Sequence, residues 1–315
     1  MVFVKMVNKM KKYALVFSGQ GSERVGMFRD FLKEPTSLNA TLVLLKDQLN
    51  LDLLAAVETK DATVVASHNQ FLLCLYHHLV ANLVMEKIGY LPSFALGHSF
   101  GQFSALAVAK AVPFTDMVGL VQKRTEIINS DEIEVKALFQ SIHGMTWEAV
   151  EDFLHTEQLD TEIAPALQNQ KEQVVCAATG RGAKQLEHLA EKYHYLLKEV
   201  PVSRPYHTSY MEEYNQRLLP FIEALPIEQP LFPIVLNFSK KGHINPKAIR
   251  EEMKVQMVKP VYWYDSVLAI EPEVDAFVII DPSETQIKIL RRITNKKIHH
   301  VNQMGILKML EKKGV

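Results

Sequence analysis

This 315-residue chain has few cysteines, no excess of charge of either sign and no hydrophobic run long enough to span a membrane. Its two cysteines, Cys74 and Cys176, both lie in apolar runs, which favours buried thiols over a disulfide and predicts a cytoplasmic setting. Lys plus Arg is 35 and Asp plus Glu is 36, so the charge balance gives no electrostatic case for binding nucleic acid. Hydrophobic residues make up 48% and charged residues 23%, which excludes a mainly disordered, collagen-like or coiled-coil chain.

Signatures of metal binding, secretion and membrane insertion are also missing from the sequence. No Cys/His spacing is typical of a zinc site, and no HExxH motif occurs, so we expect no bound metal. Residues 1–12 lack the apolar core and cleavage site of a secretion signal. The longest apolar candidate, 71–85, is interrupted by His77, His78 and Asn82, so we predict a buried helix and no membrane partner.

Short apolar runs alternate with helical patterns over most of the chain. This alternation predicts an α/β fold with a mainly parallel sheet covered on both faces. The predicted strands are 13–17, 93–96, 234–238 and 276–280, and the main predicted helices are 27–32, 67–87, 102–111, 210–225, 247–258 and 264–270.

The stretch from 135 to 203 follows a different order. Strands are predicted at 135–143, 163–168, 173–178 and 195–202, with helices at 146–157 and 184–193. The order βαββαβ is that of a ferredoxin-like fold. We therefore predict an α/β-hydrolase-like large subdomain from 1–134 and 204–315, with 135–203 inserted as a ferredoxin-like small subdomain.

The strongest chemical signal is the pentapeptide GHSFG at 97–101, a GxSxG motif between a predicted strand and a predicted helix. Such an elbow exposes its serine, here Ser99, and needs glycine on either side because neighbouring backbone passes close by. It also places the next backbone N–H, that of Phe100, where it can stabilise an oxyanion. The alternative is a tight turn that holds an inert serine.

A serine nucleophile needs a base. His207 follows a Pro-rich turn and precedes a predicted helix, a common position for an active-site loop. His98 is adjacent to Ser99 and is expected to point away from it. As an ordinary imidazole, His207 would give a pH–rate limb near 6.5.

Four motifs occur in a fixed order along the chain: GQGS at 19–22, GHSFG, Arg124 in VQKR, and the turn that ends in His207. Together they resemble the malonyl-CoA:acyl-carrier-protein acyltransferases of fatty-acid and polyketide synthesis. The resemblance runs from Tyr13 to about Ile293 and includes the ferredoxin-like insertion. It implies two-step transfer of a malonyl group from malonyl-CoA to the phosphopantetheine thiol of an acyl carrier protein.

The resemblance also implies roles for individual residues. Ser99 would be acylated, with His207 as base and then acid, and the backbone N–H of Gln20 would join that of Phe100 in the oxyanion hole. The implied chemistry needs no metal and no bound cofactor.

Two further roles follow from the resemblance. Arg124 would bind the malonyl carboxylate, a task that suits a planar guanidinium; without the resemblance, a solvated helix residue would be the favoured interpretation. Gln256 would help to orient His207. Bulky Tyr206 is expected to disfavour a methyl branch on the acyl group.

Several positions depart from the family pattern. Ser18 stands where proline is usual, Glu23 where glutamine is usual, Gln102 where glutamate is frequent and Thr125 where glycine is common. Residues 281–283 read Asp-Pro-Ser in place of Gly-Pro-Gly. These departures suggest a divergent, free-standing acyltransferase of a polyketide or lipopeptide assembly line.

Two other function classes remain open from the sequence. One is a serine hydrolase that clears acyl groups from carrier proteins, and the other is a non-catalytic binding protein on the same scaffold. A basic run near the C-terminus could meet an acidic carrier protein, although a solvated helix face is the favoured interpretation: Lys288, Arg291, Arg292, Lys296 and Lys297.

Overall fold

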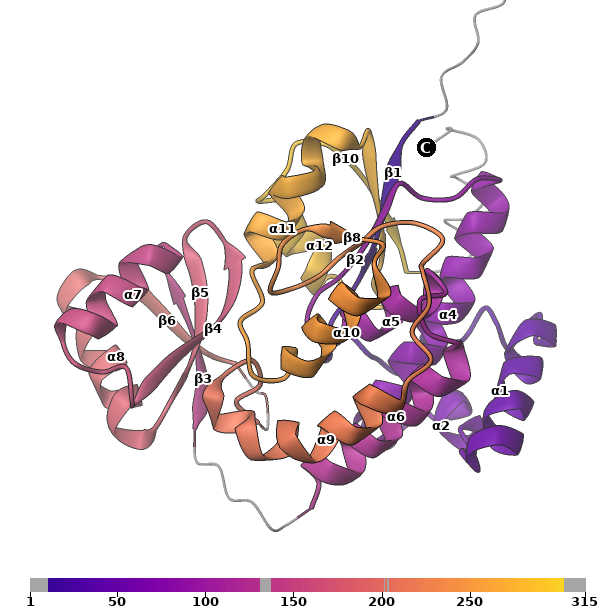
Figure 1. Cartoon of the computed structure of the whole chain (residues 1–315), viewed down its shortest axis with the longest axis horizontal. Helices are drawn as coiled ribbons and strands as arrows, with labels where there is room; N and C mark the ends of the chain where they lie inside the picture. The colour runs from indigo at the N-terminus through magenta and orange to yellow at the C-terminus, as the bar shows by residue number, and fades with distance from the viewer. Residues whose placement is uncertain (1–10, 131–136, 201, 203, 303–315) are drawn as a thin grey trace, which may run out of the picture.

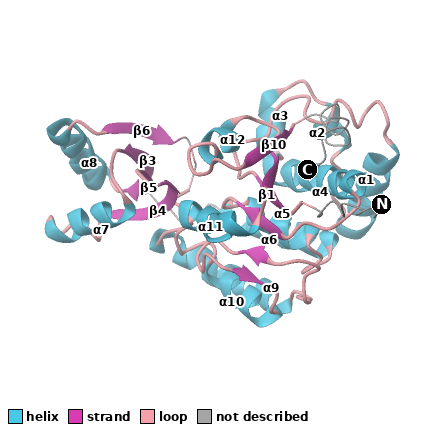
Figure 2. Ribbon diagram, turned by 90° about the horizontal axis from the view of Figure 1, so that it is seen from above, coloured by secondary structure: helices cyan, strands magenta, loops and turns pink. Residues whose placement is uncertain are grey.

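Two β-sheets lie side by side, each with its own helices (Figures 1 and 2). The computed structural model describes residues 11–130, 137–200, 202 and 204–302. The larger sheet has six strands in the order β10-β9-β1-β2-β7-β8, all parallel except β8. Its strands are β1 Tyr13–Phe17, β2 Phe94–Gly97, β7 Ile234–Val235, β8 Gly242–His243, β9 Ala276–Ile280 and β10 Lys297–Val301.

The centre of the larger sheet is apolar on both faces. Every residue of β1 is buried, and β1 pairs in parallel with β2 on one side and β9 on the other. Since successive side chains point to opposite faces, Leu15 and Phe17 enter one core cluster while Ala14 and Val16 enter the other. Helices therefore cover both faces, as the alternating pattern predicts.

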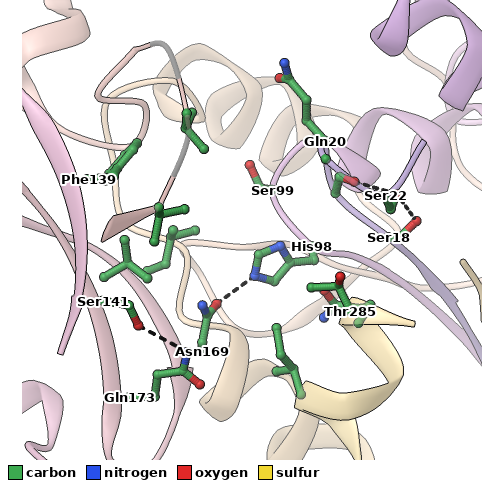
Figure 3. A pocket seen from close by; sticks show the side chains of 18 of the residues that line it. Ser18, Gln20, Ser22, His98, Ser99, Phe139, Ser141, Asn169, Gln173 and Thr285 are labelled. Carbon is green, nitrogen blue, oxygen red and sulfur yellow. Dashed lines mark hydrogen bonds between the residues drawn. The ribbon is translucent and has the colours of Figure 1, made fainter. Parts of the chain in front are cut away.

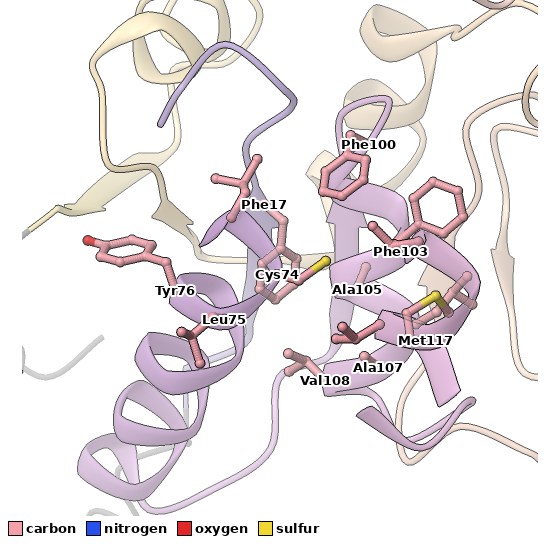
Figure 4. Close-up of a cluster of buried hydrophobic side chains, with 14 of the residues drawn as sticks. Phe17, Cys74, Leu75, Tyr76, Phe100, Phe103, Ala105, Ala107, Val108 and Met117 are labelled. Carbon is pink, nitrogen blue, oxygen red and sulfur yellow. The ribbon is translucent and has the colours of Figure 1, made fainter. Parts of the chain in front are cut away.

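One core cluster gathers α1 Thr36–Leu49, α4 Asn69–Ile88, α5 Gly101–Val108, α6 Phe114–Ile128 and α9 Glu212–Ala224. The other gathers α11 Trp263–Ile270 and α12 Thr285–Leu290. Among the described residues, α4 is the one helix long and apolar enough to cross a membrane, and 61% of its apolar window is buried inside the protein. Figure 4 shows Cys74 of α4 facing Phe100 and Ala105, so α4 packs as a core helix.

The smaller sheet is antiparallel, with strand order β4-β5-β3-β6. Its elements are β3 Leu138–His143, α7 Trp147–Thr156, β4 Ile163–Gln170, β5 Gln173–Ala178, α8 Gly180–Tyr193 and β6 Leu196–Val200. This βαββαβ unit confirms the predicted α/β architecture with a ferredoxin-like part. The predicted boundary at 134–135 and the end at 203 fall outside the described residues, so the division at those positions stays a prediction.

Some elements differ from the prediction. Phe28 and Phe31 are spaced like helix positions and are buried, but 27–32 forms successive turns, with Arg29 N bonded to Gly26 O (3.1 Å) and Lys33 N to Asp30 O (3.2 Å). The predicted strand 234–238 is reduced to two residues in β7. The pattern did not predict α1, α2 Leu54–Glu58, α3 Ala62–Ser67, β8, α12 or β10. Helix α10, Pro246–Val255, starts one residue before its prediction and ends three residues before it.

Candidate active site

Ser99 sits at a sharp turn between β2 and α5. Its φ of 51° lies in the left-handed region, which a side chain with a Cβ rarely adopts. A Cβ on Gly97 would lie 2.0 Å from the backbone of Gly101, and one on Gly101 would lie 2.5 Å from the carbonyl of Phe17. The two glycines of the motif are therefore required by backbone contacts, as the sequence predicts for a serine elbow.

His207 meets Ser99 although 108 residues separate them. Ser99 Oγ and His207 Nε2 are 2.6 Å apart. The other ring nitrogen, Nδ1, donates to the backbone carbonyl of Gln256 at 2.9 Å, which leaves Nε2 free to accept the hydroxyl proton. The φ of His207 is 66°, and its N–H donates to the carbonyl of Met257 at 2.7 Å, so backbone contacts hold this unusual conformation.

Burial decides the charge state of His207. The residue is 4% exposed, and burial, assisted by the charges of Arg124 and His98, lowers the pKa of His207 to about 3, while the bond to Gln256 opposes the shift. His207 is therefore neutral near pH 7, the form that can accept a proton. The acid limb expected for an ordinary imidazole moves to lower pH.

Asn237 was not singled out by the sequence. Its Oδ1 accepts the N–H of Ser99 at 2.9 Å, and its Nδ2 donates to the carbonyl of Gly97 at 2.7 Å. The N–H of Asn237 in turn donates to Gln102 Oε1 at 2.8 Å. The amide oxygen of Gln102 thus accepts this hydrogen bond, as the carboxylate of a glutamate at position 102 could. An isolated asparagine after a two-residue strand gives no local signal for this role.

Gln256 contacts the pair in two ways. Its backbone carbonyl holds His207, and its side-chain Nε2 donates to the carbonyl of Ser99 at 3.3 Å. The contact to His207 is thus made by the main chain of Gln256 rather than by its amide.

The GQGS turn lies directly against the elbow (Figure 3). A Cβ on Gly19 would lie 2.9 Å from the carbonyl of His98, which is why the turn can approach so closely. Ser22 Oγ donates to the carbonyl of Gly19 at 2.7 Å and closes the turn. Gln20 and Phe100, the two predicted oxyanion donors, line the same cleft as Ser99.

Arg124 reaches the same cleft from α6. Its side chain is 4% exposed, so it is not a solvated helix residue. Its Nη1 donates to Gln70 Oε1 at 2.8 Å, and its guanidinium carbon lies 4.7 Å from the centre of the Tyr206 ring. Burial lowers the pKa of Arg124, with Tyr206 opposing the shift. Within the described residues no carboxylate pairs with this cation, and its Nε has no hydrogen-bond partner.

The cleft that these residues share has a volume of about 570 Å³ and lies between the two sheets. His98 Nε2 and Asn169 Oδ1 are 2.8 Å apart across it, and Ser141 and Gln173 line the side of the smaller sheet (Figure 3). Within the described residues no cluster of three His, Cys, Asp or Glu side chains could hold a metal ion.

Only part of the predicted basic run reaches the cleft. Lys288 of α12 and Arg292 line it, together with Lys198 of β6. Lys297 begins β10, so the run is not one helix face.

Comparison with known proteins gives relatives over nearly the whole chain. The chain is 26% identical over 291 residues to the malonyl CoA-acyl carrier protein transacylase of Staphylococcus aureus strain COL, which covers 90% of this chain and 93% of that protein. It is also 26% identical over 294 residues to the transacylase of the same name from Bacillus subtilis strain 168, covering 91% and 92%.

Solved structures show the same architecture. A malonyl-transacylase in complex with a type II polyketide synthase acyl-carrier protein superposes with a TM-score of 0.88 at 26% identity, covering 96% of this chain and 100% of that one. The transacylase of Coxiella burnetii gives a TM-score of 0.88 at 24% identity, covering 96% and 98%. The family model described as the acyl transferase domain matches residues 14–312. With this match spanning both sheets and the cleft between them, the chain belongs to the acyl transferase domain family.

Proposed function

We propose that the protein transfers a malonyl group from malonyl-CoA to the phosphopantetheine thiol of an acyl carrier protein, through an acyl-Ser99 intermediate. The observation that carries the proposal is a pair of juxtapositions in one cleft. Ser99 Oγ lies 2.6 Å from His207 Nε2, and the buried cation of Arg124 lines the same cleft without a carboxylate partner among the described residues. The names of the relatives supply the substrates.

The acylation step uses the neutral form of His207. Its Nε2 accepts the proton of Ser99 Oγ as Oγ attacks the thioester carbonyl. A C–O bond forms, and the carbonyl oxygen becomes an oxyanion that the N–H groups of Gln20 and Phe100 stabilise. The tetrahedral intermediate then loses the CoA thiolate, which takes the proton from His207, and malonyl-Ser99 remains.

The transfer step runs the same chemistry in the other direction. His207 accepts the proton of the phosphopantetheine thiol, whose sulfur attacks malonyl-Ser99. The C–O bond breaks, and Ser99 recovers its proton from His207. The sum of the two steps is malonyl-CoA plus carrier thiol giving malonyl-carrier plus CoA thiol.

Arg124 supplies the preference for malonyl over uncharged acyl groups. A buried guanidinium without a carboxylate is costly, and the free carboxylate of malonyl would neutralise it through two parallel hydrogen bonds. Tyr206 packs against the guanidinium and lines the same cleft, so its bulk is expected to disfavour a methyl branch on the acyl group.

The mouth of the cleft suits a phosphorylated arm. Lys198 and Arg292 are exposed and line the cleft, and after burial their positive charges are what lowers the pKa of His143 on β3. Both CoA and the phosphopantetheine arm carry phosphate, so these cations would meet either substrate. Two buried free thiols, Cys74 and Cys176, support a cytoplasmic setting.

Intact-protein mass spectrometry with a panel of acyl-CoA thioesters tests the proposal. We expect one malonyl group to add to the protein and to leave when a phosphopantetheinylated carrier protein is supplied, with malonyl-carrier as product. Release of free malonate instead, at the same rate with or without carrier, would favour a hydrolase. Absence of any adduct with every thioester would exclude the acyl-serine mechanism.

A further inference from the structure

A buried histidine connects the two backbone segments that supply the oxyanion donors. His77 lies in the middle of α4 and has no exposed surface. Its Nε2 is 3.1 Å from Ser18 Oγ, and its Nδ1 is 2.9 Å from Ser104 Oγ. Ser18 directly precedes the GQGS turn, and Ser104 belongs to α5, the helix that starts at the serine elbow. One imidazole therefore spans the space between the turn and the elbow helix.

Ser22, the last residue in this series of hydrogen bonds, sets the direction of all of them. Ser22 Oγ donates its single proton to the carbonyl of Gly19 at 2.7 Å, so in the 2.7 Å contact with Ser18 it accepts. Ser18 then accepts from His77 Nε2–H, and His77 Nδ1 accepts from Ser104. The chain of donors runs in one direction, from the elbow helix to the turn, with a partner at each step.

Neutral His77 fits this arrangement. Burial lowers the pKa of His77 to about 3, and the nearby backbone carbonyl of Ile280 opposes the shift. The same carbonyl accepts the N–H of Ser18 at 3.3 Å, which ties the start of the turn to β9 as well. The imidazole is thus held by fixed partners in its neutral form.

We propose that His77 is a positioning residue that sets the spacing between the Gln20 and Phe100 N–H groups of the oxyanion hole. The inference rests on the proposed acyl-Ser99 chemistry. His77 does not line the cleft and does not touch Ser99, so it acts through Ser18 and Ser104 rather than on substrate.

The residue at position 18 explains why such a contact is needed here. A proline at this position would fix its own φ through the ring. Serine imposes no such restraint, but its hydroxyl can be held by hydrogen bonds to His77 and Ser22. A side-chain hydrogen bond thus replaces a covalent restraint at the start of the turn. Oxyanion donors are effective only within about 2.7–3.1 Å of the developing charge, so a loosened turn weakens the donor.

The test compares His77→Leu, His77→Gln and Ser18→Ala with wild type. His77→Leu removes both hydrogen bonds, His77→Gln retains an amide that can donate toward Ser18, and Ser18→Ala removes one oxygen without altering the core. His78→Leu is the matched control, because His78 is the next residue of α4 and stacks on Phe114, away from the turn.

Two readouts separate positioning from packing. The first is steady-state transfer of malonyl from malonyl-CoA to carrier protein, where His77→Leu should lower kcat roughly 10- to 100-fold with little change in KM, somewhat less than loss of a whole oxyanion donor. The second is the infrared band of the isotope-labelled acyl-Ser99 carbonyl, which a weakened oxyanion hole should shift to higher frequency. His77→Gln should recover most of both, and Ser18→Ala should reproduce a smaller form of both.

Several outcomes overturn the inference. If His77→Leu lowers the melting temperature but leaves kcat and the carbonyl band of the folded protein unchanged, His77 only fills the core. If His77→Leu does not fold, Ser18→Ala decides alone, and an unchanged carbonyl band there refutes the role. Equal effects in His78→Leu would also refute it. Failure of wild type to form any acyl-Ser99 would instead overturn the proposed function itself.

Discussion

The two walls of the cleft hold their side chains in different ways. On the wall of the larger sheet, His207 and Arg124 are each 4% exposed, and main-chain or side-chain hydrogen bonds fix their orientation. On the wall of the smaller sheet, Lys198 is exposed and His143 is half-buried. Groups that make and break bonds need one geometry and a dry environment, whereas a long flexible substrate arm can be held by mobile charges. The comparison assigns chemistry to one wall and substrate capture to the other.

Ser99→Ala should have the largest effect and tests whether the chemistry is confined to the wall of the larger sheet. Without the nucleophile, the malonyl adduct should disappear and turnover should fall roughly 10³-fold or more. Intact-protein mass spectrometry and a carrier-protein transfer assay measure both. Ser130→Ala is the control, because Ser130 lies outside the cleft. Ser104→Ala is not suitable, since Ser104 contacts His77. An adduct that persists in Ser99→Ala would mean that another residue is acylated.

Arg124→Ala should have the next largest effect and distinguishes a clamp from a packing residue. A hydrogen bond to a charged group contributes about 1.5–3 kcal/mol, so kcat/KM for malonyl-CoA should fall roughly 10- to 1000-fold. Activity on acetyl-CoA should hold or rise, because that substrate carries no carboxylate. Arg124→Lys should keep the charge but lose the two-pronged contact, and it should fall between wild type and Arg124→Ala.

The control for this change is Arg217→Ala, which removes an arginine paired with Glu213 on the outer face of α9. It should leave the malonyl-to-acetyl ratio unchanged. The ratio in Arg124→Ala is the informative quantity, since a folding defect lowers both activities together. If the malonyl-to-acetyl ratio does not change in Arg124→Ala, Arg124 does not bind the malonyl carboxylate.

Removing an exposed charge from the wall of the smaller sheet should have a smaller effect, on KM rather than on kcat. For Lys198→Ala, on β6 of the smaller sheet, we expect KM for malonyl-CoA to rise roughly 2- to 5-fold, since a solvent-exposed ion pair contributes at most about 1 kcal/mol. The value of kcat should stay close to wild type, and the difference should shrink at high salt. Arg291→Ala is the matched control, because Arg291 is exposed but does not line the cleft. A fall in kcat with constant KM would contradict the division between the walls.

The smallest expected change is in the acid limb of acylation. An ordinary imidazole with a pKa near 6.5 would be about nine-tenths protonated at pH 5.5, which would cost about tenfold in rate. Burial lowers the pKa of His207 to about 3, so the neutral base persists as pH falls and is lost only as pH approaches that lower value. Between pH 7 and 5.5 we therefore expect kcat/KM for malonyl-CoA to change by less than about twofold. A tenfold loss over this range would show that His207 titrates as if exposed.

Local patterns in the sequence predicted most of the elements and the serine elbow. Residues 13–17 and 276–280 are apolar without interruption, which is typical of strands buried on both faces, and the structure has β1 and β9 there. The pattern failed where local and tertiary signals disagree. Strand β10 consists of basic and histidine residues with apolar ones between, and it becomes a strand only because β9 offers it an edge to pair with.

What the sequence determined by itself is local sterics and composition: the glycines that permit the turn at Ser99, the periodicities, and the ordered motifs that resemble one family. Only the tertiary structure decided which distant groups meet. Asn237 lies 138 residues from Ser99 yet holds its N–H, and His77 joins two segments that no sequence spacing connects. The physical reason is that spacing along the chain encodes short-range backbone geometry, whereas strand order in the sheet brings remote residues together. Burial of Arg124, and with it the free-energy cost of a buried cation, likewise exists only in the folded protein.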